Sequence, residues 1–155
     1  MPLAAIALGS NLGDREATLA SAIRALSEHG EVIAVSTTFD TDPVGYADQP
    51  RFLNAAVLLK TSLAPPDLLR TLLWIEHVHG RDRSHGIDKG PRTLDLDLLL
   101  YDEVVMTTPE LTLPHPQMHA RRFVLEPLAQ IAPTMIHPLL GRTVAQLLAQ
   151  TNLAV

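Results

Sequence analysis

The chain has 155 residues, of which 46% are hydrophobic and 19% charged, and this predicts one folded domain spanning residues 1–155 rather than a disordered chain. Its formal net charge of −5 argues against a protein whose main task is to neutralise nucleic-acid phosphates. Cysteine is absent, which excludes disulfides and thiolate metal sites and is consistent with a cytoplasmic location.

The first part of the chain predicts strands, a helix and a loop. Residues 3–8 form an apolar run that ends at a Gly-Ser-Asn turn signal and predicts a buried strand; no basic leader precedes it, and we expect neither a signal peptide nor a membrane span. A helix begins at Asp14, and Gly30 is placed as its C′ residue. Residues 32–39 predict a strand, residues 40–51 a loop, and residues 52–63 a long strand.

The second part predicts a helix from Pro65 to near Gly80, with Glu76 as a buried carboxylate on its apolar face that needs a partner. A charged loop at residues 80–90 leads into a strand at residues 93–101. Residues 104–106 predict a short strand, residues 112–119 are irregular, and residues 121–131 and 143–150 predict helices. This order predicts an α+β sandwich in which helices cover one face of a mainly antiparallel sheet.

Two aspartates interrupt the strand at residues 93–101. Side chains alternate faces along a strand, so Asp95 and Asp97 point to one face with Cα atoms roughly 6–7 Å apart. Leu94, Leu96 and Leu98 then point to the other face. A solvent-facing strand accounts for this pattern, and an acidic pair is also a way of holding hard cations through oxygen ligands.

Positive residues surround this acidic pair in the sequence. Arg92 lies three residues before Asp95, and Arg81, Arg83 and Lys89 lie in the charged loop. Such a combination suits phosphoryl transfer, because Mg²⁺ ions clamp phosphate oxygens and guanidinium groups neutralise developing charge. A solvated charge run is the alternative for the loop alone. The chain has neither a Walker A motif nor the protein-kinase motifs, so ATP would bind by another route.

Four segments together resemble the 6-hydroxymethyl-7,8-dihydropterin pyrophosphokinase family. They occur in the order ALGSNLGD, QPRFLNAAV, GPRTLDLDLLLYD and LTLPHPQMHARRFVLEPL. The resemblance covers about residues 4–133. It implies a ferredoxin-like βαββαβ fold and an enzyme of folate biosynthesis that transfers pyrophosphate from ATP to the hydroxymethyl group of the pterin.

The resemblance also implies roles for individual residues. Two Mg²⁺ ions would bind Asp95 and Asp97, and Arg81 and Arg92 would act with these aspartates in catalysis. The implied contacts of ATP, the co-substrate, are Arg83, Arg92, Thr112, His115 and Arg121. The implied contacts of the pterin are Thr41, Pro43, Val44, Gly45, Phe52, Asn54 and Phe123.

Other interpretations remain open from the residues alone. Phe52 and Phe123 would by default be core residues, and Asn54 would be a satisfied polar residue within a strand. The alternative functions are another Mg²⁺-dependent phosphotransferase or hydrolase, and a ferredoxin-like binding module. The chain lacks the aromatic motif of RNA-binding modules, so we expect no nucleic-acid partner. We also expect small-molecule substrates, no membrane partner and a monomer.

Three residues depart from the family pattern. They are Lys89 before the Gly-Pro-Arg segment, Glu110 before the Leu-Thr-Leu-Pro-His segment, and Pro116 after the histidine. Lys89 bears on how the 80–90 loop closes, and the other two bear on the details of the ATP site. The implied reaction class is the same with or without them.

Overall fold

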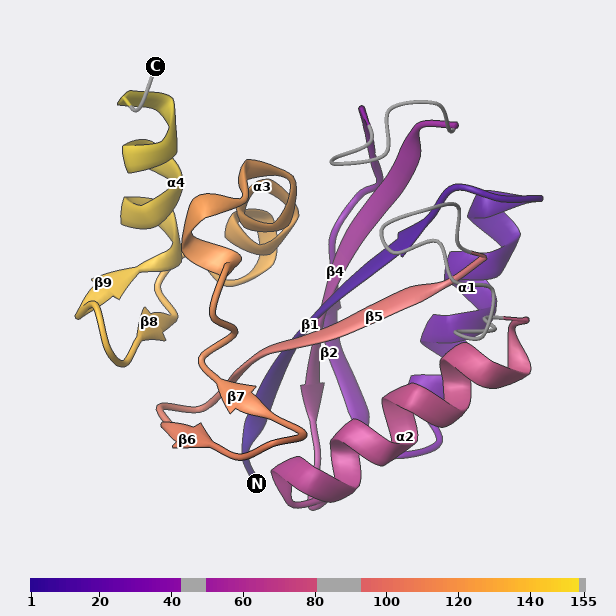
Figure 1. Ribbon diagram of the computed structural model, residues 1–155, viewed down its shortest axis with the longest axis horizontal. Coiled ribbons are helices and arrows are strands. Elements are labelled where there is room, and N and C mark those ends of the chain that lie inside the picture. The colour runs from indigo at the N-terminus through magenta and orange to yellow at the C-terminus, as the bar shows by residue number, and fades with distance from the viewer. Residues whose placement is uncertain (43–49, 81–92, 154–155) are drawn as a thin grey trace.

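The computed structural model describes residues 1–42, 50–80 and 93–153. Its main sheet has strands in the order β2-β4-β1-β5, and each neighbouring pair is antiparallel (Figure 1). These strands are β1 (Leu3–Ser10), β2 (Glu31–Val35), β4 (Phe52–Lys60) and β5 (Asp95–Tyr101). With α1 (Arg15–Leu26) after β1 and α2 (Pro65–Val78) after β4, they form the predicted ferredoxin-like βαββαβ fold.

The remaining elements are short strands, one 3₁₀ turn and two further α-helices. The strands are β3 (Phe39–Thr41), β6 (Met106–Thr107), β7 (Thr112–Leu113), β8 (Ile136–His137) and β9 (Arg142–Thr143). The helices are a 3₁₀ turn at Met118–Ala120, α3 (Arg122–Ile131) and α4 (Val144–Leu153). None of the helices in the described residues has the length and hydropathy of a membrane-spanning segment.

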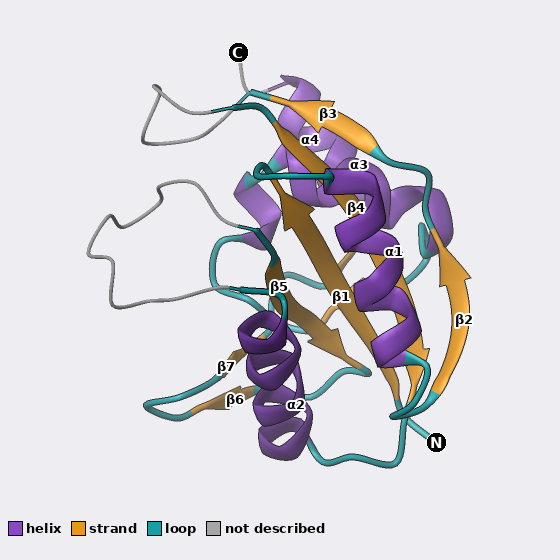
Figure 2. Ribbon diagram, turned by 90° about the vertical axis from the view of Figure 1, so that its right-hand side faces the viewer, coloured by secondary structure: helices purple, strands orange, loops and turns teal. Residues whose placement is uncertain are grey.

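Helices cover both faces of the main sheet (Figure 2). α1 and α2 pack on one face with side chains such as Ile6 and Leu72, whereas α3 and α4 pack on the other with Ala5, Ala56 and Leu125. The prediction of helices on one face was therefore wrong. Helices cover the second face because the central strands are buried on both faces. Small side chains on β1 and β4 let α3 approach this face closely.

A β-bulge at Leu99 shifts the pairing of β5 with β1. Leu98 pairs with Ile6 and Leu100 with Ala5, so that Leu99 is the additional residue. Leu99 and Leu100 both face α3 and α4, while Leu98 faces α1 and α2. The bulge explains why Leu99 and Leu100, although adjacent in the strand, face the same side of the sheet.

The strand predicted at residues 32–39 divides into β2 and β3 at Ser36. The Ser36 hydroxyl accepts a hydrogen bond from the Ala56 backbone N–H at 2.8 Å, and the Ser36 N–H donates to the Ala56 carbonyl at 2.9 Å. The side chain thus replaces a ladder partner and interrupts the strand. β3 resumes pairing with the first residues of β4, from Thr41 opposite Phe52 to Phe39 opposite Asn54.

Several element boundaries differ from the sequence prediction. β1 continues through Gly9 to Ser10, and β7 and the β8–β9 hairpin were not predicted. Helix α1 ends at Leu26, so Gly30 is not its C′ residue. A Cβ atom at Gly30 would lie 2.4 Å from the Lys60 carbonyl oxygen, and glycine is required there by this close approach.

Candidate active site

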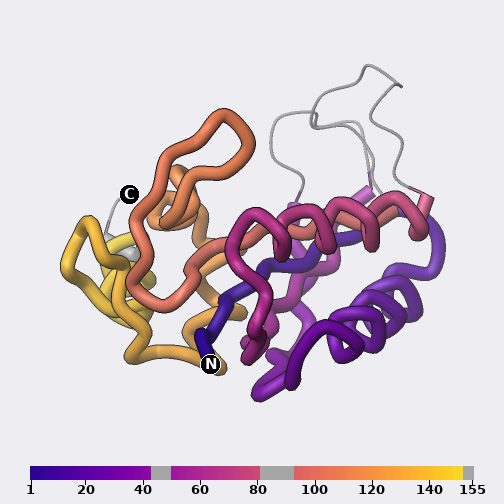
Figure 3. The backbone as a smooth tube through the Cα atoms, turned by 90° about the horizontal axis from the view of Figure 1, so that it is seen from below, coloured from indigo at the N-terminus to yellow at the C-terminus, as the bar shows by residue number. Residues whose placement is uncertain are grey.

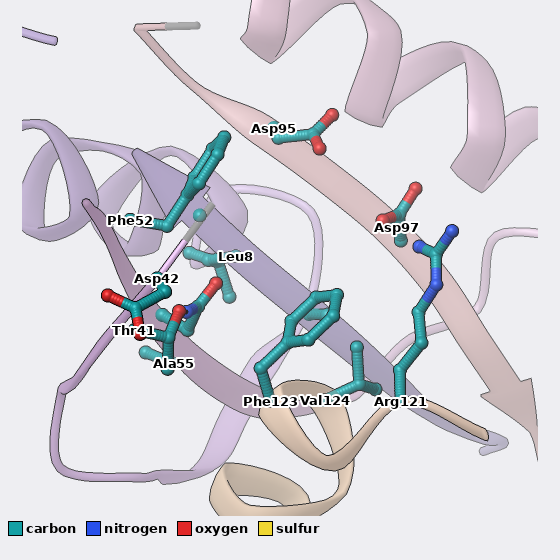
Figure 4. Close-up of a pocket in the computed structure, with 13 residues that line it drawn as sticks. Leu8, Thr41, Asp42, Phe52, Ala55, Asp95, Asp97, Arg121, Phe123 and Val124 are labelled. Atoms are coloured by element: carbon teal, nitrogen blue, oxygen red, sulfur yellow. Dashed lines mark hydrogen bonds between the residues drawn. The ribbon is translucent and has the colours of Figure 1, made fainter. Parts of the chain in front are cut away.

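A pocket opens on the face of the sheet that α3 covers only in part (Figure 4). It encloses about 750 Å³, part of it open to solvent, between strands β1, β3, β4 and β5 and the first turn of α3. The small residues Ala7 and Gly9 form its floor, because they leave space that a larger side chain would fill. The pocket therefore lies where the sheet extends beyond the covering helix.

Strand register places the polar residues of the pocket in rows across the sheet. Asn54 lies opposite Gly9, and Gly9 lies opposite Asp95 on its other side. Ala7 lies opposite Asp97 in the next row on this face. Because neighbouring strands are about 4.8 Å apart, Asn54 and Asp95 lie about 10 Å apart across the glycine. A flat ring of pterin size can thus span the floor between an amide and a carboxylate.

Two phenylalanine rings border this floor. Phe52 comes from the start of β4 and Phe123 from the first turn of α3, and both side chains project into the pocket in Figure 4. Both residues are only partly buried. Partly exposed rings on two elements that face one pocket fit a binding role better than the core role that the sequence alone left open.

Asn54 is buried, and its Nδ2 donates a hydrogen bond to Thr41 Oγ1 at 2.5 Å. This bond directs the other side of the amide towards Gly9, since a Cβ atom at Gly9 would lie 3.2 Å from Asn54 Oδ1. Both Asn54 and Thr41 line the pocket. The amide thus presents an acceptor oxygen at the floor of the pocket.

Asp95 and Asp97 both line the pocket from β5, as the alternation of the strand predicted (Figure 4). Leu94, Leu96 and Leu98 pack on the opposite face. The two carboxylates are half-buried and supply oxygen ligands of the kind that Mg²⁺ prefers. The prediction that both aspartates share one face is confirmed, while their role as metal ligands stays a prediction.

Arg121 brings a positive charge to the same wall. Its side chain extends from the start of α3 towards Asp97 in Figure 4, and its guanidinium lies 5.7 Å from the centre of the Phe123 ring. Its Nη2 donates to Oε1 of Gln117. The charge is therefore held between the aromatic ring and the acidic pair.

His115 follows β7 and is joined to β5. Its backbone N–H donates to the carbonyl of Leu99, the bulge residue, at 2.9 Å. Burial, with a smaller contribution from Arg121, lowers the pKa of the His115 imidazole below its ordinary value, and Asp95 opposes this shift. Nδ1 accepts the Gln117 N–H at 3.2 Å, which leaves the proton of the neutral ring on Nε2 as a donor.

Glu76 is buried, as predicted. Its Oε2 accepts a hydrogen bond at 2.8 Å from the backbone N–H of Leu96, the residue between the two aspartates. The sequence predicted that this carboxylate needs a partner, and the structure shows a strand amide as one partner. This hydrogen bond joins α2 to β5.

The other predicted site residues either do not line the pocket or lie outside the described residues. Thr112 lies in β7 and is not among the residues that line the pocket. Arg81, Arg83, Arg92, Pro43, Val44, Gly45 and Lys89 lie outside the described residues. Sequence reasoning missed Ala7, Gly9 and Asp42 as pocket residues. A glycine within an apolar strand was the available signal for Gly9, because it often marks a close approach.

The fold and the pocket together define a class of protein: a ferredoxin-like α+β domain with a pocket lined by two phenylalanine rings and two carboxylates. A family model described as 7,8-dihydro-6-hydroxymethylpterin-pyrophosphokinase (HPPK) matches residues 5–133. The chain belongs to this family, as its motifs implied.

Individual relatives agree with the family match. The 2-amino-4-hydroxy-6-hydroxymethyldihydropteridine pyrophosphokinase of Bacillus subtilis (strain 168) is 50% identical over 131 residues, covering 83% of this chain and 77% of that protein. The protein of the same name from Pseudomonas aeruginosa is 47% identical over 146 residues, covering 93% of this chain and 88% of that protein. The crystal structure of Plasmodium falciparum HPPK-DHPS wild type with SDX-DHP matches with a TM-score of 0.72 at 15% identity, covering 97% of this chain and 43% of that longer chain. The last match confirms the fold.

Proposed function

We propose that this protein transfers the pyrophosphoryl group of ATP to the hydroxymethyl oxygen of 6-hydroxymethyl-7,8-dihydropterin, giving AMP and the pterin pyrophosphate. The observation that carries the proposal is the pocket, in which two aromatic rings and an amide share one face of the sheet with two carboxylates. Relatives that share about half of the aligned residues are named for this activity. Enzymes of the family use ATP as co-substrate.

The pterin would lie between Phe52 and Phe123 above Gly9. This position is supported by the two rings, which line the same pocket, and by the acceptor oxygen of Asn54, which suits an N–H group on the ring edge. Thr41 would hold the amide in this orientation. Backbone groups of Pro43, Val44 and Gly45 are proposed to bind the guanidine-like edge.

The acidic pair fits a magnesium site that the nucleotide completes. Mg²⁺ is usually held by one or two carboxylates together with substrate phosphates and water. The described residues contain no group of three or more His, Cys, Asp or Glu side chains that could hold a metal ion by themselves. We propose that two Mg²⁺ ions bind at Asp95 and Asp97. When bound, they supply neutralisation of charge on the phosphate oxygens and a more reactive hydroxyl.

The protein groups would act by position and charge. Arg121 holds a guanidinium beside Asp97, and neutral His115 offers an Nε2–H donor. Both suit ATP phosphate or ribose oxygens on the β5 side of the pocket. Arg81, Arg83 and Arg92 are proposed to bind and neutralise the phosphates, with Thr112 as a further ATP contact. No covalent enzyme intermediate is needed for in-line transfer, so orientation and electrostatic stabilisation supply the catalysis.

Product analysis tests this proposal directly. The purified protein is incubated with ATP, Mg²⁺ and 6-hydroxymethyl-7,8-dihydropterin, and the nucleotides and pterins are separated by chromatography. We expect AMP and pterin pyrophosphate in equal amounts, with no AMP when the pterin is omitted. Formation of ADP would instead indicate a phosphotransferase that moves a single phosphate.

The proposed working state is a monomer in the cytoplasm that acts on small molecules and binds neither nucleic acid nor membrane. The net charge of −5 supports the exclusion of nucleic acid. Light scattering of the purified protein at assay concentration would show a mass of 16.9 kDa if the monomer is correct.

A further inference from the structure

A group of charged side chains joins the start of α1 to β3 and to the start of β4. Arg15 donates from both terminal nitrogens to Asp40, from Nη1 to Oδ1 at 3.2 Å and from Nη2 to Oδ2 at 3.3 Å. Arg15 Nη1 also donates to the Arg51 carbonyl at 2.9 Å, and Arg51 Nη2 donates to the Asp40 carbonyl at 3.1 Å. We call Arg15, Asp40 and Arg51 the back brace.

The back brace acts on the strand that carries Thr41. Asp40 and Thr41 are successive residues of β3, so their side chains point to opposite faces. Thr41 faces the pocket and accepts the hydrogen bond from Asn54 Nδ2, whereas Asp40 faces Arg15 at the start of α1. The contacts that hold Asp40 on the α1 side of β3 therefore restrain the backbone that directs the Thr41 hydroxyl into the pocket.

β3 needs such support because it is short. It contributes only three residue pairs to the ladder with β4. Exposed ion pairs are individually weak, but paired contacts between an arginine and a carboxylate, and networks of several charges, are the stronger cases. The Arg15 hydrogen bonds, with further attraction from the charges of Arg15 and Arg51, hold the pKa of the Asp40 carboxyl below its usual value despite opposing desolvation. The back brace is thus an electrostatically coupled unit.

We infer that the back brace is a positioning device for the pterin: it fixes Thr41 and, through Thr41, the amide of Asn54. This inference rests on the proposed function, because it assigns the pterin as the ligand that Asn54 meets. Arg15, Asp40 and Arg51 are not among the residues that line the pocket, although Arg51 Nε lies 3.2 Å from the carboxylate of Asp42, which does line it. The three therefore act through Thr41 and Asp42 and are positioning residues.

Steady-state kinetics distinguish positioning from general stabilisation. Arg15→Ala and Asp40→Asn should each raise the KM for the pterin about 3- to 5-fold. They should leave kcat and the KM for ATP within about twofold, because the lost contact supports substrate binding alone. Arg15→Lys keeps the charge but not the paired contact, and it should restore part of the pterin affinity.

The matched control is Arg70→Gln. It breaks the exposed Arg70–Asp67 ion pair of 2.7 Å on α2, far along the chain from β3, and should change neither KM. A thermal unfolding curve for each variant shows whether the fold is intact. If Arg15→Ala does not fold, Arg15→Lys and Asp40→Asn provide the same comparison.

A second measurement reports on Asn54 without any reaction. The side-chain NH₂ signals of Asn54, identified in ¹⁵N spectra by their loss in Asn54→Ala, should exchange with solvent faster in Arg15→Ala and Asp40→Asn than in Arg70→Gln. Unchanged exchange in both brace variants would overturn the inference, as would equal rises in the KM values for pterin and ATP. If the wild type formed no AMP, the proposed function would fail, and the exchange rates alone would decide the positioning of Asn54.

Discussion

Gly9 and Asn54 lie opposite each other on β1 and β4, and a Cβ atom at Gly9 would lie 3.2 Å from Asn54 Oδ1 and 3.6 Å from Cδ1 of Phe52. The absence of a side chain at one position therefore sets the space around two proposed pterin contacts. β1, the indigo segment that begins at the N-terminus in Figure 3, lies between β4 and β5 in the main sheet, so this position cannot move away easily.

Gly9→Ala should impair pterin binding more than ATP binding. The added methyl group must displace the Asn54 amide or the Phe52 ring by a few tenths of an ångström, and it also occupies the floor of the pocket. We expect the KM for the pterin to rise about tenfold, which corresponds to about 1.4 kcal/mol. Ala7→Gly, on the same strand, is the control, because it changes the volume at the floor of the pocket without adding atoms to it. Equal pterin KM values for Gly9→Ala and wild type would contradict the steric argument.

Removing one of the paired carboxylates should abolish most activity. Asp97→Ala, measured at saturating Mg²⁺, should lose several kcal/mol of transition-state stabilisation, or about 10³-fold in kcat/KM. Asp67→Ala, which removes an exposed carboxylate from α2, should retain full activity. Chelation of divalent ions should stop the wild-type reaction, and added Mg²⁺ should restore it. Turnover by Asp97→Ala close to that of the wild type would exclude the metal assignment.

Glu76, on α2, should stabilise the fold through its hydrogen bond to β5. Glu76→Ala leaves the buried Leu96 N–H without the carboxylate that accepts its hydrogen bond at 2.8 Å. The free energy of unfolding should fall by about 1–3 kcal/mol, measured by urea denaturation. Glu76→Gln keeps an acceptor oxygen and should lose less. Glu28→Ala removes an exposed carboxylate and should have almost no effect; equal losses at both positions would show that the Leu96 hydrogen bond contributes nothing.

The stability of the protein should decline in mildly acidic solution. Burial, with a smaller effect of His119, lowers the pKa of His137, while a backbone hydrogen bond opposes the shift. Because the unfolded state then binds the proton more readily, the stabilisation is complete above the ordinary value of 6.5 and is lost as the pH falls below it.

The measurement is the free energy of unfolding between pH 7.5 and about pH 5. His137→Asn should flatten the curve in part, and the shift of His115 in the same direction leaves a residual slope. Arg142, the register partner of His137, and His119, whose ring centre lies 6.0 Å from that of His137, are unchanged in this variant. His77→Asn, at an exposed position, is the matched control. A wild-type-like slope in His137→Asn would show that this histidine is not responsible.

Local patterns predicted the parts of the site that depend on a single element. The period of two in a strand placed Asp95 and Asp97 together, and the apolar face of α2 marked Glu76 as buried. The predicted strand and helix order also agrees with the fold. These features follow from residue spacing, which the sequence contains directly.

Features that depend on contacts between distant segments were not predictable in this way. The second helical layer was missed because a strand buried on both faces has no alternating pattern to show which faces are covered. Ser36 resembles any strand residue until its hydroxyl is seen to replace a ladder partner of Ala56. The contact between Arg15 and Asp40 joins residues 25 positions apart, and no local pattern indicates it.

Through the bulge residue Leu99, β5 supports both the acidic pair and His115, which is proposed to contact ATP. Asp95 and Asp97 project from one end of this strand, while the Leu99 carbonyl holds the backbone of His115 at the other. A small tilt of the strand would carry the carboxylates and the histidine together as one rigid body. The distances between the carboxylates and His115 would then stay constant while their distances from Phe52 and Asn54 change. Any change in the relative position of the two proposed substrates would therefore occur across the sheet rather than along β5.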